Sequence, residues 1–315
     1  MLIKRKEKWQ ESENSVTGEN AYLNRRNILL GAAAAGAATI IPSVLAQPQR
    51  KLNALSARKT DYSPGESPSP EEAITQYNNY YEFGTGKSDP AQNAWRLQPK
   101  PWSIQVDGLV DKPATYGIED LIDFNALEER IYRHRCVEAW SMVMPWIGVP
   151  LSSVLKKIGV QSGAKYVRFE TLADKEQMPG LRWPVLDWPY TEALRMDEAM
   201  NDLSFLVVGL YGKELPNQNG APVRLAVPWK YGFKHVKSIV RISLTEEQPV
   251  TTWQASAPRE YGFYSNVNPE VSHPRWSQAR ERRIGEFGRR PTEMFNGYGE
   301  LVADMYAGMD LARNF

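Results

Sequence analysis

A single cysteine, Cys136, occurs in the 315 residues of the chain, so no disulfide can form within it. A chain of this length can bury a sizeable core in one large domain or two modest ones. The fold must therefore be stabilised by packing rather than by disulfides. The cysteine lies in the aromatic stretch RIYRHRCVEAWSMVMPWIGVPL, residues 130–151.

The first 46 residues have the pattern of an export signal. Arg25 and Arg26 directly precede an apolar run rich in Ala and Gly, which ends in VLA at residue 46. This pattern is typical of a signal peptide, and the paired arginines resemble the bacterial twin-arginine signal. A membrane anchor or a buried helix is the alternative, but the run is short and poorly apolar. We expect twin-arginine export to the periplasm, a route that favours a cofactor inserted before export.

The net charge argues against a polyanionic partner. The whole chain has a formal charge of +1, and without the first 46 residues it has 32 basic and 33 acidic side chains. Nucleic acid is therefore not an expected partner.

The hydrophobic pattern predicts a mixed α+β fold in which strands dominate. Residues 47–76 are polar and rich in Ser and Pro, which indicates a linker or surface arm, and a single folded domain is expected at 77–315. The last 65 residues look irregular and are expected to wrap the body. Alternating or continuous apolar segments predict strands at 102–110, 164–172, 203–212, 221–228 and 237–246, and short helices are predicted at 117–124, 151–159 and 191–199.

Cys136 is a candidate metal ligand. Arg133 and Arg135 flank it, and a nearby guanidinium favours the thiolate, which is a soft ligand. The alternative is an inert buried thiol. Zinc, iron–sulfur, blue-copper and bis-histidine haem sites fit poorly, because the chain offers one Cys and three scattered His. What remains is a metal with one protein thiolate and other ligands from an organic cofactor.

The segment RCVEAWSMVMPWIGVPL is similar to the cysteine-ligand segment of sulfite-oxidase-fold molybdenum enzymes. More narrowly, the chain resembles the catalytic subunits of bacterial periplasmic protein-methionine-sulfoxide reductases. The resemblance covers nearly the whole chain after residue 76. It rests on long blocks at 77–84, 127–148, 218–240, 251–269 and 273–279.

This resemblance implies a strand-rich sulfite-oxidase-type molybdopterin-binding fold with one catalytic domain. It also implies a molybdenum–molybdopterin cofactor, with Cys136 as the metal ligand. A pterin edge and a phosphate need hydrogen-bond donors and a few cations. The expected cofactor-binding residues are Asn78, Asn79, Tyr81, Glu82, Thr171, Asn219, Arg224, His235, Val236 and Lys237.

Glu138 is the second candidate catalytic residue, because it could orient a metal-bound water or accept a proton. The alternative is a salt bridge to Arg133 or Arg135. Sulfite oxidases usually carry a Gly-Asn-Arg-Arg-like stretch after the ligand, whereas this chain has Val137 to Trp140. An acidic, aromatic mouth suits a neutral sulfoxide better than a sulfite dianion. Candidates for this mouth are Tyr80, Trp140, Trp146, Trp229 and Tyr231.

The expected function is therefore repair of exported proteins by reduction of methionine sulfoxide, through oxygen-atom transfer. The resemblance implies a haem-containing membrane subunit, which draws electrons from quinones and forms a heterodimer with a monomeric catalytic subunit. The alternatives are a sulfite oxidase or dehydrogenase, a reductase of small S- or N-oxides, and a cofactor-binding or structural envelope protein without turnover.

Overall fold

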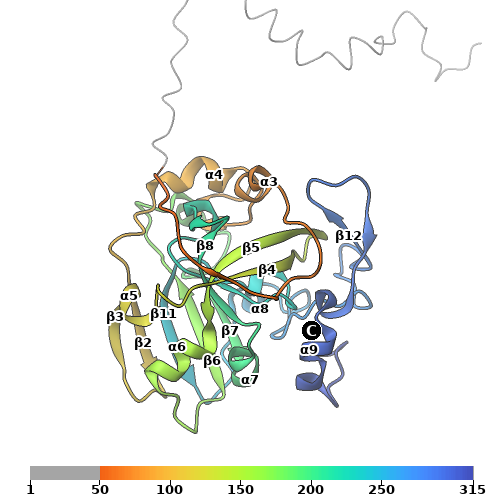
Figure 1. Cartoon of the computed structure of the whole chain (residues 1–315). Coiled ribbons are helices and arrows are strands. Elements are labelled where there is room, and N and C mark those ends of the chain that lie inside the picture. Colours follow the sequence, from red (N-terminus) through yellow and green to blue (C-terminus); the bar gives the residue numbers. More distant parts are fainter. Residues whose placement is uncertain (1–49, 315) are drawn as a thin grey trace, which may run out of the picture. The chain divides into compact units, whose positions relative to one another are not determined.

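The computed structural model describes residues 50–314, whose strands form two mixed sheets with short helices around them (Figure 1). The expected signal segment, residues 1–46, lies outside the described residues. The boundaries of the linker at 47–76 and of the domain at 77–315 remain predictions. Within the described part, the chain before residue 77 already packs on the folded body, because Ile74 is fully buried and Leu55 packs against the core.

The smaller sheet has five strands in the order β3-β2-β11-β6-β7. Strands β2 and β11 run parallel, and the other neighbours run antiparallel. Burial alternates along these strands: Ile104 and Val106 are buried in β2, and Val167 and Phe169 are buried in β6. The strands are β2 Ser103–Gly108, β3 Ala114–Gly117, β6 Tyr166–Thr171, β7 Thr191–Arg195 and β11 Ile239–Thr245.

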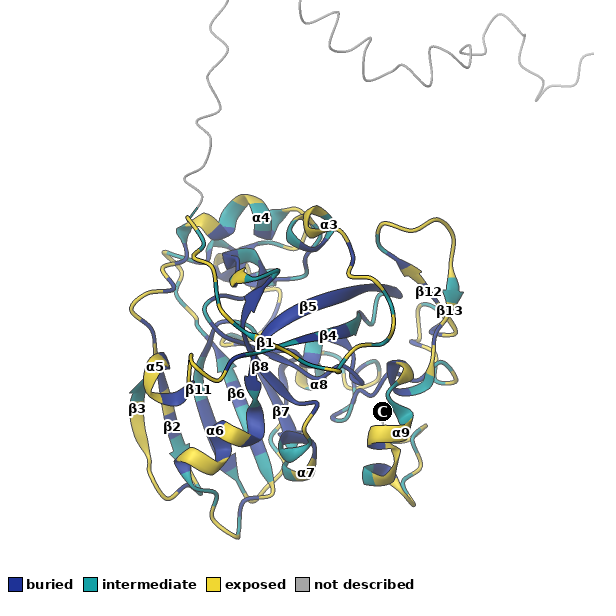
Figure 2. Cartoon of the chain, in the orientation of Figure 1, coloured by how far each residue is buried: buried dark blue, intermediate teal, exposed yellow. Residues whose placement is uncertain are grey.

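The larger sheet has eight strands, and a long hairpin of β4 (Glu128–Arg135) and β5 (Trp140–Pro150) forms its centre. These two strands pair antiparallel along the whole length of β4. Strand β5 also pairs with β8 and β12, so it lies inside the sheet and is buried at every position except the last (Figure 2). The other strands are β1 Arg58–Lys59, β8 Phe205–Leu210, β9 Lys213–Glu214, β10 Arg224–Ala226, β12 Arg280–Arg283 and β13 Arg290–Pro291.

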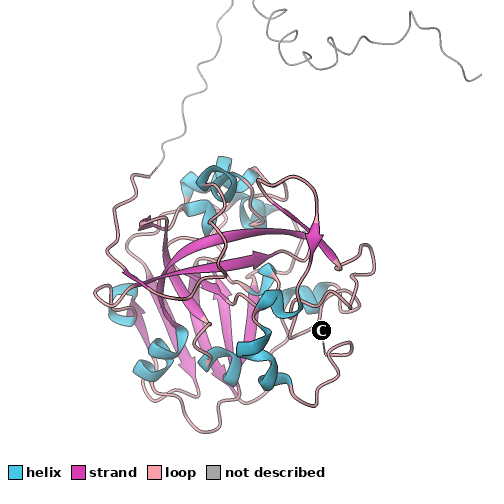
Figure 3. Ribbon diagram, turned by 45° about the vertical axis from the view of Figure 1, so that its right-hand side comes forward, coloured by secondary structure: helices cyan, strands magenta, loops and turns pink. Residues whose placement is uncertain are grey.

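The helices of the described part are short and lie around the strands (Figure 3). The longest, α6, buries Val154, Leu155 and Ile158 on one side and ends at Gly159, whose φ of 76° favours glycine. Among residues 50–314, no helix is long and apolar enough to cross a membrane. The α-helices are α3 Glu71–Gln76, α4 Asp89–Asn93, α5 Ile118–Leu121, α6 Leu151–Ile158, α7 Met196–Met200, α8 Thr252–Ser256 and α9 Gly299–Val302. The 3₁₀ helices are η2 Tyr81–Phe83, η3 Ala94–Arg96, η4 Pro179–Arg182, η5 Asn217–Asn219, η6 Gly232–Lys234, η7 Met294–Gly297 and η8 Ala303–Tyr306.

The strand-rich α+β class is confirmed, and each predicted strand segment contains an observed strand. The helix predicted at 191–199 is wrong over its first half. Residues 191–195 instead form β7, because pairing with β6 outweighs a local helical preference. The last 65 residues are mostly irregular, as expected, but β12 joins the larger sheet beside β5.

Candidate functional site

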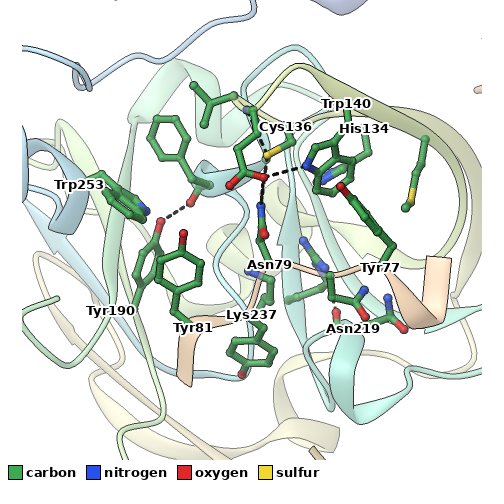
Figure 4. Close-up of a pocket in the computed structure, with 18 of the residues that line it drawn as sticks. Tyr77, Asn79, Tyr81, His134, Cys136, Trp140, Tyr190, Asn219, Lys237 and Trp253 are labelled. Carbon is green, nitrogen blue, oxygen red and sulfur yellow. Dashed lines mark hydrogen bonds between the residues drawn. The ribbon is translucent and has the colours of Figure 1, made fainter. Parts of the chain in front are cut away.

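A cavity of about 420 Å³ opens beside the turn between β4 and β5, and Cys136 forms part of its wall. Its other walls come from the segment around η2, from η5 and β10, and from residues that follow η6. Figure 4 shows these side chains converging: Asn79 points at the thiol, and Asn219 and Lys237 approach from below. Segments that lie far apart in the sequence thus meet at one site.

The thiol is held in a tight turn. Strand β4 ends at Arg135, and the main-chain N–H of Cys136 donates to the carbonyl of Trp140 at 2.9 Å. Ala139 closes the turn with a φ of 62°, in the left-handed region. Cys136 is 5% exposed. Its sulfur accepts hydrogen bonds of 3.4 Å from Asn79 Nδ2 and from the main-chain N–H of Glu138. Two donors are therefore aimed at the sulfur.

Burial and, to a smaller extent, the charge of Glu138 together raise the pKa of the Cys136 thiol to about 12, against smaller opposing effects of Lys87 and Arg135. The thiol of the ligand-free protein is therefore protonated at neutral pH. A bound metal cation removes such a proton outright, so the thiolate belongs to the metal-bound state.

The prediction that the flanking arginines favour the thiolate holds only weakly, through the charge of Arg135, and neither arginine contacts the sulfur. Arg135 is fully buried and its Nε donates to Glu281 at 2.8 Å, while Nη1 donates to the carbonyl of Cys136 rather than to its sulfur. Arg133 is bound by Glu66 and Glu293. Successive side chains of a strand point to opposite faces, so His134 faces the cavity and the two arginines face away from it.

Glu138 lies in the cavity wall beside the thiol, and it pairs with Lys87 rather than with Arg133 or Arg135, the partners of the alternative interpretation. Lys87 Nζ lies 2.7 Å from Glu138 Oε2, and the side chains of Asn79 and Trp140 donate to the same oxygen at 3.1 and 3.0 Å. Burial raises the pKa of Glu138, but these three hydrogen bonds outweigh burial and hold the pKa below its ordinary value. Glu138 is therefore an ionised carboxylate, held by a lysine that the sequence did not single out.

Most of the predicted cofactor-binding residues line this cavity together. His235 and Val236 are exceptions: His235 Nε2 contacts the carbonyl of Val227 at 2.8 Å, and Val236 is fully buried in the core. The residues in the cavity wall are Asn78, Asn79, Tyr81, Glu82, Thr171, Asn219, Arg224 and Lys237.

Several buried polar atoms in the cavity wall have no hydrogen-bond partner among the described residues. They are Asn78 Oδ1, His134 Nδ1, Thr171 Oγ1 and Asn219 Oδ1. Native proteins satisfy nearly all buried polar groups, so a cluster of orphaned atoms around one cavity indicates a polar ligand.

The charged groups of the cavity point to the same conclusion. Arg224 is 4% exposed and donates only to main-chain oxygens, the shortest at 2.9 Å to Asn219. Burial lowers the pKa of Lys237 to about 8 and raises that of Glu82 to about 7. No carboxylate lies within ion-pair distance of Arg224 or Lys237 in the part of the chain that the structure describes. Two such cations suit an anionic group such as a phosphate.

No group of three or more His, Cys, Asp or Glu side chains within residues 50–314 is arranged to hold a metal ion. A metal bound at Cys136 would therefore take its other ligands from a non-protein group. The donors, acceptors and cations of the wall fit a molybdopterin, which carries a polar pterin edge and a phosphate.

The predicted aromatic mouth is only partly correct. Tyr80 and Trp140 line the cavity, but Trp146, Trp229 and Tyr231 are buried elsewhere. The half-exposed aromatic residues at the cavity are instead Tyr77, Tyr81, Phe233, Trp253 and Trp276. Trp253 and Trp276 lie in the sequence blocks at 251–269 and 273–279, which carry the resemblance. The sequence therefore pointed to these segments but did not identify the two tryptophans as residues of the cavity wall.

Comparison with known proteins relates the chain to molybdopterin-binding oxidoreductases. The family described as "Oxidoreductase molybdopterin binding domain" matches residues 91–253. The chain is 53% identical to a protein-methionine-sulfoxide reductase catalytic subunit, MsrP, of Pseudomonas syringae pv. tomato, in an alignment that covers all of both chains. Among solved structures it resembles the sulfane dehydrogenase SoxCD from Paracoccus pantotrophus, with a TM-score of 0.43 and 18% identity over 72% of this chain and 59% of that one.

Proposed function

The chain belongs to the oxidoreductase molybdopterin-binding family and is a homologue of protein-methionine-sulfoxide reductase catalytic subunits, and we propose that it reduces methionine sulfoxide residues in exported proteins. The observation that carries the proposal is the single buried thiol at a cavity with orphaned polar atoms and two buried cations that form no ion pair with the described residues. The ionised Glu138 beside the thiol supports a neutral sulfoxide over a sulfite dianion as substrate.

Each part of a molybdenum–molybdopterin group has candidate partners in the cavity. Cys136 would be the protein ligand of the metal, and Arg224 and Lys237 would bind the phosphate. The side chains of Asn78 and Asn219 would form hydrogen bonds with the pterin edge. When bound, this group supplies two-electron oxygen-atom transfer from the sulfoxide, which leaves a thioether.

The chain's own residues contribute orientation and proton handling. Reduction of a sulfoxide consumes two protons, and the carboxylate of Glu138 is the charged group with the largest effect on the thiol. Lys87 and Asn79 hold this carboxylate in place and leave it able to accept and pass on a proton. Tyr81, Trp253 and Trp276 give the cavity an apolar approach that suits the thioether product.

The electron donor and the compartment are part of the same proposal. We expect a haem-containing membrane subunit to supply the two electrons, with this chain as the monomeric catalytic subunit of a heterodimer. Export to the periplasm rests on the paired arginines at 25–26.

Metal analysis and an assay with an artificial electron donor test the proposal. The exported protein should contain molybdenum and reduce methionine sulfoxide, and Cys136→Ser should lose both properties while keeping its melting temperature within a few degrees. Absence of molybdenum from the folded protein would rule the proposal out. So would sulfite oxidation at a higher kcat/KM than sulfoxide reduction, which would favour a sulfite dehydrogenase.

A further inference from the structure

Large apolar side chains are exposed on a loop beside the cavity. This rim loop, residues 182–189, leaves Trp183 69% and Val185 45% exposed. Val250, on a neighbouring segment, is 68% exposed. Exposed apolar groups that gather beside a site commonly mark a surface that another molecule covers.

The rim loop is continuous with the cavity wall. Leu186 within it and Tyr190 just after it both line the cavity, and Tyr190 is anchored by a hydrogen bond of 2.6 Å to the carbonyl of Phe233. Helix η4, which leads into the loop, packs directly on the main chain of Tyr81, leaving no room for a side chain at Gly180. A molecule lying on the loop would thus be next to a group inside the cavity.

A second contact connects the rim loop to the aromatic residues of the cavity. The main-chain N–H of Thr191, the first residue of β7 just after the loop, donates to Thr252 Oγ1 at 2.8 Å and so ties this segment to helix α8. Helix α8 carries Trp253, whose ring meets that of Tyr81 edge-on at 5.8 Å, and Val250 lies just before the helix. Figure 4 shows Trp253, Tyr190 and Tyr81 together on one side of the cavity.

We propose that the rim loop binds the apolar residues that flank methionine sulfoxide in a substrate polypeptide; this inference rests on the proposed function. A methionine side chain is joined to a polypeptide, so when the sulfoxide reaches the cavity, the neighbouring residues must lie on its rim. Trp183 and Val185 offer those neighbours an apolar surface, and burying a tryptophan supplies much of the energy in a typical interface.

The charges of the loop favour this occupant over an electron-donor protein. Arg182 and Asp187 balance each other within the rim loop, so it does not select a charged partner. The hairpin of β12 and β13 is different, because Arg280, Arg282 and Arg289 are all exposed there. A basic face of that kind suits electrostatic docking of an acidic protein, whereas the rim loop suits an apolar peptide.

The test compares substrates that differ only beside the sulfoxide. The double variant Trp183→Ser/Val185→Ser is assayed with an artificial electron donor on three substrates: free methionine sulfoxide, a synthetic peptide with Leu on both sides of a central methionine sulfoxide, and the same peptide with Gly on both sides. We expect the KM for the Leu-flanked peptide to rise about tenfold with little change in kcat. Values for free methionine sulfoxide and the Gly-flanked peptide should stay within twofold of wild type.

Phe287→Ser is the matched control. Phe287 is fully exposed on the β12–β13 hairpin, so this substitution removes a similar apolar surface outside the rim loop. It should leave all three substrates unchanged. A binding measurement without turnover completes the design: the labelled Leu-flanked peptide should bind the metal-free double variant about tenfold more weakly than metal-free wild type, by fluorescence anisotropy.

The outcomes separate the inference from the function on which it rests. If wild-type protein reduces none of the substrates, the proposed function fails. If it reduces them all but the double variant keeps the wild-type KM for the Leu-flanked peptide, the rim-loop inference is overturned. A variant impaired only when a membrane donor supplies electrons would assign the loop to that donor instead. If the double variant misfolds, two measurements still test the inference. Wild type should have a lower KM for the Leu-flanked than for the Gly-flanked peptide, and Val185→Ser should reduce this difference.

Discussion

Replacing Arg224 by methionine should make the ligand-free protein more stable, although it removes a buried hydrogen-bonding residue. Arg224 has no carboxylate partner among the described residues, and its guanidinium lies 5.0 Å from the ring centre of Trp146. Burial lowers its pKa to about 10, yet the group stays charged at neutral pH. At 1.36 kcal/mol per pH unit, this corresponds to an electrostatic cost of about 3 kcal/mol.

The hydrogen bond from Arg224 to Asn219 offsets about 1 kcal/mol of that cost. We therefore expect Arg224→Met to raise the free energy of unfolding of the metal-free protein by about 1–2 kcal/mol in urea at pH 7. The same variant should retain less cofactor after purification, because it lacks a cation for the phosphate.

Lys230→Met is the matched control. Lys230 is also fully buried, but its Nζ is satisfied by Glu198 at 2.6 Å, by the carbonyl of Tyr264 at 2.8 Å and by Asn266 at 2.9 Å. Its removal leaves a buried carboxylate without its cation and should cost about 3–5 kcal/mol. If metal-free Arg224→Met is less stable than wild type by more than 1 kcal/mol, the reasoning that Arg224 is uncompensated is refuted.

Three further predictions concern protonation. Because burial raises the pKa of Cys136 to about 12, against an ordinary 9, the thiol of the metal-free protein should react with iodoacetamide at pH 8 about a thousandfold more slowly than an ordinary thiol, as followed by mass spectrometry. The pKa of Glu82 rises from 4.5 to about 7 on folding, chiefly through burial, so its contribution to stability is fully present below pH 4.5 and is lost as the pH rises to 7. The free energy of unfolding of the metal-free wild type should thus fall by about 3 kcal/mol between pH 4.5 and pH 7 because of Glu82. Glu82→Gln should abolish this fall, as measured by urea unfolding. Lys87→Met should raise the pKa of Glu138 and move the acidic limb of the pH–rate profile to higher pH, whereas Lys100→Met, which removes an exposed ion pair with Glu214, should not.

The fold was predictable where one face of a strand is buried, because alternation then appears in the sequence. Strands β2 and β6 are examples. The central hairpin was harder to see, because β5 is buried on both faces and has no alternation. In β4, Arg130 and Arg135 are buried although they are polar, so burial there cannot be inferred from residue type. Strand β7 was hidden for a similar reason, since its Glu192 is buried against Lys234 at 2.7 Å.

The site was predictable as a set of residues, and eight of the predicted cofactor-binding positions line one cavity. The partners within it were not predictable, because they depend on how separate segments approach each other. Lys87 lies 51 positions before Glu138 and contacts it at 2.7 Å. The residues of the aromatic mouth were predicted incorrectly for the same reason. Trp229 donates a hydrogen bond to Tyr306 in the core, whereas Trp253 lines the cavity.

The contacts of Arg135 bear on how a thiol of such high pKa could bind a metal. Arg135 donates to the carbonyl of Cys136, and Trp276 and Gln278 both donate to the carbonyl of Val137 at 2.8 Å. The turn is thus fixed through its main chain by groups that do not touch the sulfur. These contacts do not involve the sulfur itself. A metal that replaced the proton there would leave them intact, and its bond to the thiolate would offset most of the cost of deprotonation that burial imposes.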